Sequence, residues 1–191
     1  MPTPTSLAFT VFLHGVGHSG DSANEINFAF SNQNPLTTTR PVTVEVYFEE
    51  PQPTPLPPVL TLVTTVTGTI TYQAAGGVFT GTVSMGTLPS NTFLVKIKSD
   101  KYLRQVVGLP TIIAGTVNTM PQVTLVTGDI VNDNILDILD YNQLYGCYSV
   151  DAPARNCNAS QKFQADLNDD GNVDQYDYNL FIRELGNRIG G

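Results

Sequence analysis

The sequence is poor in charge, lacks tryptophan and has no long apolar run. Asp, Glu, Lys and Arg make up 14% of the 191 residues, and the formal net charge is −8. Lys and Arg form no cluster, which argues against nucleic-acid binding. No apolar run approaches the ~20 residues that a membrane-spanning helix needs. A sugar-stacking surface would have to use Tyr, so carbohydrate binding is disfavoured but stays open.

Sequence patterns typical of catalytic sites are also missing. The chain contains no Gly-x-Ser-x-Gly sequence, the pattern of a nucleophile elbow. Glu49 and Glu50 are neighbours on a predicted strand, so their side chains should point to opposite faces. His14 and His18 flank a glycine-rich segment and supply too few ligands for zinc. We therefore expect a protein that is not an enzyme.

The most specific pattern is the segment Asp166–Asp177, called the second loop from here on. It places oxygen-bearing side chains at positions 1, 3, 5, 9 and 12 of a 12-residue loop and Gly171 at position 6, where a sharp bend is needed. Calcium prefers six to eight oxygen ligands, and this spacing supplies them. The expected ligands are Asp166, Asn168, Asp170, the carbonyl of Asn172, Asp174 and Asp177.

A degenerate copy of this pattern, called the first loop from here on, occupies Asp129–Asp140. Its expected ligands are Asp129, Asp133, the carbonyl of Ile135, Asp137 and Asp140. Position 3 is Val131, which offers no side-chain ligand, and position 6 is Asn134, a residue type that tolerates positive φ. We therefore expect two calcium ions, with the weaker site in the first loop.

Two such loops, each followed by a short predicted helix, resemble a dockerin, a calcium-dependent module that binds cohesins. The resemblance covers about residues 127–187, and the stretch Gly128–Asn134 is closer to the type II branch. Ile138-Leu139 and Gln175-Tyr176 stand where type I dockerins have Ser-Thr. The resemblance implies a protein partner, either a cohesin-like domain or another copy of the chain. The residues expected to face it are Ile138, Leu139, Asn142, Tyr145, Gln175, Tyr176, Asn179, Leu180 and Arg183.

Residues 6–126 are rich in Thr and Val and alternate between apolar and polar side chains over several short runs. About seven strands separated by turn signals predict an antiparallel β-sandwich, immunoglobulin-like or transthyretin-like. The run Phe93–Arg104 resembles the X module that precedes type II dockerins. The predicted fold class is thus α+β in two domains: a linker remnant at 1–5, the sandwich at 6–126, and a small α-helical dockerin-like calcium-binding domain at 127–191.

The two cysteines, Cys147 and Cys157, are close enough in sequence to form a disulfide. A disulfide and two calcium loops together favour an extracellular or cell-surface protein. We expect a mature fragment or excised piece of a larger exported protein. Its predicted function is a non-catalytic, calcium-stabilised interaction module that binds a partner or anchors a surface assembly. The alternatives are a self-assembling subunit of an extracellular filament or surface layer, and a carbohydrate-binding sandwich.

Overall fold

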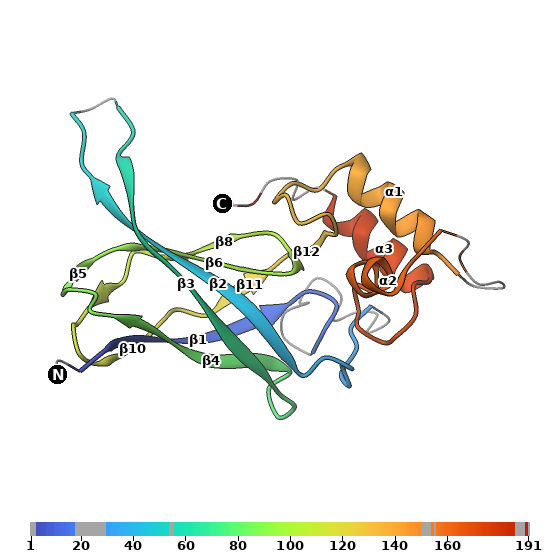
Figure 1. The fold of residues 1–191 in the computed structure, drawn as a ribbon, viewed down its shortest axis with the longest axis horizontal. Coiled ribbons are helices and arrows are strands. Elements are labelled where there is room, and N and C mark those ends of the chain that lie inside the picture. The colour runs from blue at the N-terminus through green and yellow to red at the C-terminus, as the bar shows by residue number, and fades with distance from the viewer. Residues whose placement is uncertain are drawn as a thin grey trace.

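The computed structural model describes residues 3–17, 30–53, 56–149, 154, 156–185 and 190. Strands dominate these residues, and three helices follow near the C-terminus (Figure 1). The strands are β1 (Thr5–Leu13), β2 (Thr39–Glu50), β3 (Val59–Gln73), β4 (Val78–Gly86), β5 (Asn91–Thr92), β6 (Leu94–Ser99), β7 (Lys101–Tyr102), β8 (Gln105–Gly108), β9 (Thr111–Ile112), β10 (Val117–Thr119), β11 (Val123–Leu125) and β12 (Thr127–Asp129). The helices are α1 (Ile138–Cys147), α2 (Ala159–Ala165) and α3 (Gln175–Glu184).

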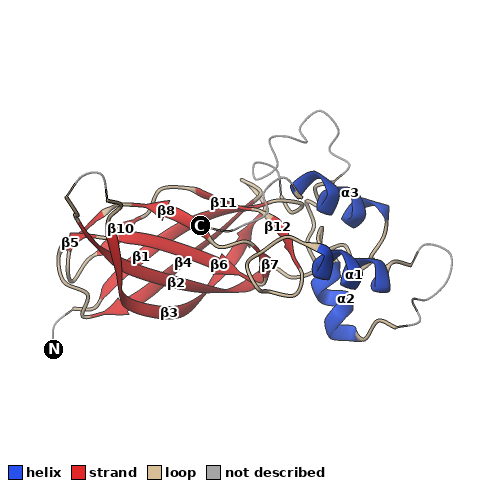
Figure 2. Ribbon diagram, turned by 90° about the horizontal axis from the view of Figure 1, so that it is seen from above, coloured by secondary structure: helices blue, strands red, loops and turns tan. Residues whose placement is uncertain are grey.

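One eight-stranded sheet forms the body of the molecule. Its strand order is β10-β1-β4-β3-β2-β6-β8, and β11 also pairs with β1. The neighbours in this order are antiparallel, except that β10 and β11 run parallel to β1. The sheet curls until β11 and β8, from opposite ends of the order, contact each other (Figure 2). The result is a half-barrel around one hydrophobic core.

Alternation along β1 explains how the sheet encloses its core. Leu7, Phe9, Val11 and Leu13 are all buried, and the residues between them are partly exposed. Each fully buried side chain of this kind contributes ~1.5–3 kcal/mol relative to an exposed one. Since β1 pairs with β4 on one side and with β10 and β11 on the other, it is an internal strand of this chain.

The β2–β3 hairpin extends beyond the body as a long arm (Figure 1). Within the described residues, β3 pairs with β2 along its whole length but with β4 only at Thr71–Gln73. Its first half carries large exposed apolar side chains, including Leu60 and Leu62. From Val59 to Thr67, the outer edge of β3 therefore has no strand partner within the described residues, whereas Thr69 and Ile70 lie against Gly81 of β4.

The helices pack against one end of the sheet (Figure 2). A second hydrophobic cluster joins Leu144, Leu180 and Phe181 of the helices to Leu103 and Val126, which precede the first loop. A short antiparallel ladder between β12 and β7 also ties the start of the first loop to the strands. Within the described ranges, no helix is long and apolar enough to cross a membrane.

The predicted fold class, an α+β protein in two domains, is wrong. The chain is mostly β, and its strands form one curled half-barrel sheet in place of a sandwich of two packed sheets. No separate α-helical domain is evident, because the described helices pack into a core that includes residues from the strand region. Alternating burial predicts one buried face per strand, but it does not distinguish a curled sheet from two packed sheets. The contacts that join the helices to the sheet are long-range and leave no local pattern.

Candidate functional site

In the second loop, acidic side chains accept hydrogen bonds from the backbone N–H groups of the same loop. The carboxylate of Asp166, at position 1, accepts hydrogen bonds from the N–H groups of Asp170 at 3.1 Å and Gly171 at 2.9 Å. The carboxylate of Asp177, at position 12, accepts from the N–H groups of Leu167 at 2.6 Å and Asn168 at 3.1 Å. These contacts hold the first and last predicted ligands of the loop against the same short stretch of backbone, residues 167–171.

Asp177 is fully buried, and burial is the main reason that its pKa rises to about 7. Hydrogen bonds from the N–H groups of Asp174 and Asn168 lower this pKa, while the nearby charge of Asp166 raises it further. Amide dipoles alone thus compensate this buried charge incompletely. A bound cation would remove the remaining penalty.

The first loop repeats this hydrogen-bond pattern. Asp129, at position 1, accepts from the N–H of Asn134 at 3.0 Å. Asp140, at position 12, accepts from the N–H groups of Val131 and Asp137, both at 2.9 Å. The pKa of Asp140 is raised, and burial is the main cause. The two loops are therefore alike in structure as well as in sequence.

Backbone conformation strengthens this equivalence. Positions 4 and 6 have positive φ in both loops: Asn132 and Asn134 in the first, Asp169 and Gly171 in the second. Asn134 adopts a φ of 71°, the conformation expected of it from its residue type. An Asn at position 6 thus supports the same bend that glycine makes in the second loop.

Positions 9 and 12 also begin the helices. Asp137 caps α1 and Asp174 caps α3, each accepting a hydrogen bond from a first-turn N–H group. Asp140 and Asp177 reach back to the cap residues and complete a capping box in each helix. Such caps stabilise a helix by about 1 kcal/mol. These four acids therefore have a structural role whether or not an ion binds.

The loops fit calcium in frame and donor type, but their side chains are directed at backbone amides. Within the described residues, no three His, Cys, Asp or Glu side chains converge closely enough to hold a metal ion. Asp133 and Asp170 accept hydrogen bonds from the N–H groups of Ile135 and Asn172. Asp129 Oδ1 is buried and has no hydrogen-bond partner among the described residues. An ion in the first loop would coordinate this unpaired oxygen of Asp129. An ion in the second loop would compensate the buried charge of Asp177.

Buried charges attach the second loop to the sheet, and no local sequence pattern indicates them. Arg40 Nη2 on β2 lies 3.2 Å from Asp169 Oδ2. The backbone N–H and hydroxyl of Thr37 donate to the same carboxylate at 2.7 and 2.9 Å. Lys101, the first residue of β7, is fully buried and donates to the backbone carbonyls of Phe163 and Asp166. Burial first, and then the charge of Arg40, lower the pKa of Lys101 to about 8.

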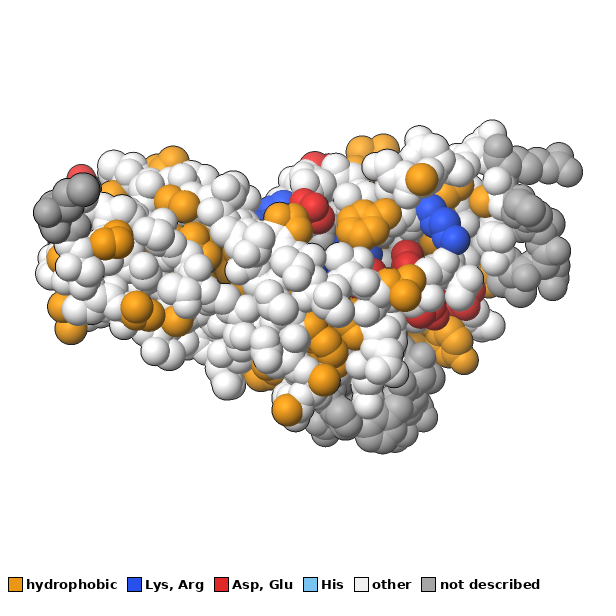
Figure 3. All heavy atoms as spheres, turned by 60° about the horizontal axis from the view of Figure 1, so that its bottom comes forward, with side chains coloured by type: hydrophobic (Ala, Val, Ile, Leu, Met, Phe, Trp, Pro, Cys, Tyr) orange, Lys and Arg blue, Asp and Glu red, His pale blue; other side chains and the backbone are white. Residues whose placement is uncertain are grey.

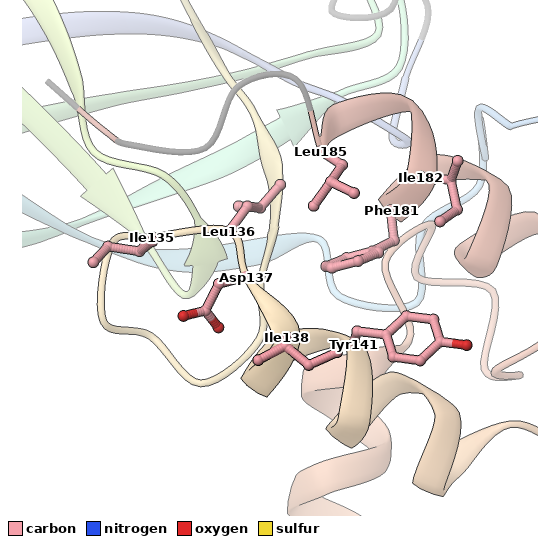
Figure 4. Close-up of a pocket in the computed structure, with 8 residues that line it drawn as sticks. All are labelled: Ile135, Leu136, Asp137, Ile138, Tyr141, Phe181, Ile182 and Leu185. Atoms are coloured by element: carbon pink, nitrogen blue, oxygen red, sulfur yellow. The ribbon is translucent and has the colours of Figure 1, made fainter.

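An apolar groove of about 580 Å³ lies between α1 and α3, beside the first loop (Figure 4). Ile138 and Tyr141 line it from α1, and Phe181, Ile182 and Leu185 line it from α3 and its C-terminal end. Ile138 and Ile182 are 62% and 45% exposed, so this lining is open to solvent. A wall of this composition suits the apolar side chains of another protein.

The structure places most residues predicted to face a partner at the surface, with one clear exception. Ile138, Leu139, Asn142, Tyr145, Gln175 and Tyr176 are exposed, and Asn179 and Arg183 are half-buried. Leu180 is fully buried in the second hydrophobic cluster, so its assignment to the partner face is wrong. Its Cδ1 lies close to Gly15, from the end of the sheet that α3 covers. No local sequence pattern indicates that contact, and Ile182, an exposed groove residue, is absent from the predicted partner face.

A disulfide joins Cys147 to Cys157, with Cα atoms 4.9 Å apart. It connects the C-terminal end of α1 to the residue before the N-cap of α2. Cys147 is buried against the second hydrophobic cluster, and Cys157 packs on the same cluster. The bridge therefore fixes the connection between the two loop–helix units.

Comparisons with known proteins support the fold. No protein-family model matches the chain, and no curated protein matches it. The structure is similar to chains in two crystal structures of a type II cohesin–X–dockerin complex from Acetivibrio cellulolyticus, an N-terminal and a C-terminal interface mutant. Each comparison has a TM-score of 0.52 and 15% identity, and covers 94% of this chain and 94% of that chain. At this identity the likeness shows a cohesin/X-dockerin-like fold.

Proposed function

We propose that this chain is a non-catalytic, calcium-stabilised protein–protein interaction module of an exported protein. The proposed partner is a cohesin-like domain, which would resemble the pairing named for the structurally similar complexes. The apolar groove between α1 and α3 is the observation that carries the proposal, because it combines exposed Ile138 and Ile182 with a fixed helix pair. The disulfide favours an oxidising compartment, and therefore export.

The groove is proposed to receive apolar side chains of the partner, with exposed polar residues around it. Ile138, Leu139 and Tyr145 offer apolar surface along α1, and Gln175 and Tyr176 offer a different surface at the start of α3. Calcium would hold the two loops from which these helices start. It would therefore stabilise the shape of the binding face without contacting the partner.

The test is a binding measurement with a panel of type II cohesin domains, with and without chelator. The double variant Ile138→Asp/Leu139→Asp should abolish binding, because unpaired charges in an interface core are strongly unfavourable. Neither side chain is a predicted calcium ligand, so calcium binding should persist. The control variant Val106→Asp/Ile113→Asp alters two exposed apolar residues of the sheet region and should bind normally. Equal binding by both double variants would show that the groove is not the interface.

A second candidate function, a self-assembling subunit, is favoured by the free edge of β3. Residues 51–95 contain no Asp, Glu, Lys, Arg or His. The face shown in Figure 3 agrees, since the sheet end carries scattered apolar side chains and few charged ones. Edge strands in monomeric proteins are usually protected by charge or proline, and β3 has neither from Val59 to Gln73. Two copies of β3 could therefore pair antiparallel without repulsion between like charges.

Sedimentation across a range of concentrations tests this second candidate. Thr65 and Thr67 are exposed on β3, so Thr65→Lys/Thr67→Lys would place like charges on the edge and should prevent association. The control Thr82→Lys/Ser84→Lys adds the same charge on exposed positions of β4, which already pairs with β1. A monomeric parent chain at all concentrations would exclude self-assembly through β3.

A further inference from the structure

Lys98 extends from β6 to the first ligand position of the first loop. Its Nζ contacts Asp129 Oδ2 and also donates to the carbonyl of Tyr102 at 2.8 Å. The Asp129 side chain is completely buried, whereas that of Lys98 keeps 19% of its surface exposed. A protein ammonium group thus pairs with the carboxylate that opens the predicted calcium loop.

In the second loop, the carboxylate at position 1 has different hydrogen-bond partners. The carboxylate oxygens of Asp166 accept hydrogen bonds from backbone N–H groups, those of Asp170 and Gly171. The nearby lysine, Lys101, donates to the backbone carbonyl of Asp166 and not to its carboxylate. Two lysines from consecutive strands, Lys98 on β6 and Lys101 on β7, therefore reach the two loops, but of these two only Lys98 pairs with a predicted ligand side chain.

The chemistry of the two cations makes them alternatives at Asp129. An ammonium group and a calcium ion both need the lone pairs of this carboxylate, and their positive charges repel each other at short distance. The first loop has little else to offset that repulsion, because Val131 leaves position 3 without a side-chain ligand. Asp129 Oδ1, which has no hydrogen-bond partner among the described residues, still provides a lone pair for an entering ion.

We propose that Lys98 is an internal competitor of calcium at the first loop. Calcium enters this loop only when the Lys98 ammonium leaves Asp129, so the first loop is the low-affinity site. When calcium is absent, Lys98 keeps the first loop charge-paired and attached to β6. The inference rests on the proposed calcium binding, but it concerns only how the two loops differ.

The test is a calorimetric calcium titration of the whole chain and of Lys98→Met, with the Asn134 and Gly171 amides followed by NMR to report on each loop. Lys98→Met should tighten calcium binding at the first loop at least tenfold and leave the second loop unchanged. Lys98→Arg keeps the charge and should keep the weak affinity. Lys96→Met removes a lysine from the same strand, where its Nζ lies over the Tyr47 ring, and should change neither site.

Several outcomes would overturn the proposal. Unchanged affinity at the first loop in Lys98→Met would do so, as would tightening that appears at the second loop. Equal tightening in Lys96→Met would show a general charge effect in place of competition. If Lys98→Met does not fold without calcium, Lys98→Gln provides a neutral hydrogen-bond donor, and the same tightening is required of it. Loss of all calcium binding in the parent chain would instead contradict the proposed function.

Discussion

Arg40 and Asp169 form an ion pair between the sheet and the second loop, at 3.2 Å and with both side chains 2% exposed. The guanidinium of Arg40 also lies 5.7 Å from the ring centre of Phe79 and 5.8 Å from that of Tyr102. These contacts make the second loop part of the packed body of the protein. They explain why the helices do not form a separate domain.

Removing one partner of this pair should be strongly destabilising. Asp169→Asn leaves the Arg40 charge buried and unpaired, so we expect a loss of about 3–5 kcal/mol in the free energy of unfolding, measured with urea. The double variant Arg40→Met/Asp169→Asn should recover part of that loss. The control is Glu45→Gln, which breaks the more exposed Glu45–Arg104 pair at 3.1 Å and should change stability by less than ~1 kcal/mol. Equal losses for the two single variants would contradict the role given to the buried pair.

The two closing acids should differ only when calcium is present. Asp177→Ala and Asp140→Ala each remove one half of a capping box, so in chelator they should lower the melting temperature by similar amounts. With calcium, Asp177→Ala should lose more, because it removes a ligand from the stronger predicted site. Scanning calorimetry with and without calcium checks this. A larger calcium-dependent loss for Asp140→Ala would reverse the predicted order of the two sites.

Reduction of the Cys147–Cys157 disulfide should weaken the helical end of the molecule. The bridge closes a short loop, so removing it should destabilise the protein by about 2–3 kcal/mol. Guanidinium unfolding of the parent chain with and without reductant measures the loss. The double variant Cys147→Ser/Cys157→Ser should show the same loss and no response to reductant. A reductant effect that persists in the double variant would exclude the disulfide as its cause.

The lowered pKa of Glu184 predicts that the free energy of unfolding depends on pH in a specific way. Burial alone would raise its pKa, but His14, whose Nδ1 lies 3.0 Å from Glu184 Oε1, and the charge of Arg183 outweigh burial and hold the pKa below its usual 4.5. A depressed carboxylate pKa stabilises the folded state above the unfolded pKa, and that contribution disappears as the pH falls through the folded pKa. Glu184→Gln should therefore be less stable than the parent by ~1–3 kcal/mol at pH 7, and this difference in stability should shrink as the pH falls below 4.5. Urea unfolding from pH 3 to 7 measures it, and a gap that stays constant with pH would contradict the assignment.

Local features of this protein could be predicted from the sequence because they depend on neighbouring residues. The spacing of Asp166–Asp177 predicts a sharp loop followed by a helix, and the structure has both. The residue type at Asn134 predicts its positive φ, which the structure shows. The burial of Leu144 and Phe181 follows from helical periodicity and is also confirmed.

The global features could not be predicted, because they depend on residues far apart in the chain. The parallel pairing of β1 with β10 and β11 joins strands more than a hundred residues apart, and no short motif encodes it. Lys98 and Arg40 lie on strands with ordinary alternation, so nothing local connects them with acidic residues of the loops. Leu180 follows the helical spacing of an exposed residue but is covered by the end of the sheet at Gly15.

The position of β1 has a consequence for how the chain folds. Val11, Phe12 and Leu13 pair with Val123, Thr124 and Leu125, and Ser6, Leu7 and Ala8 pair with Val117, Asn118 and Thr119. A chain made from its N-terminus cannot complete the sheet until the residues up to Leu125 have emerged. Non-local pairing of this kind slows folding, because the loop must close before its contacts form. We therefore expect folding in milliseconds to seconds. During synthesis, β1 cannot pair with β10 and β11 until most of the chain has been made.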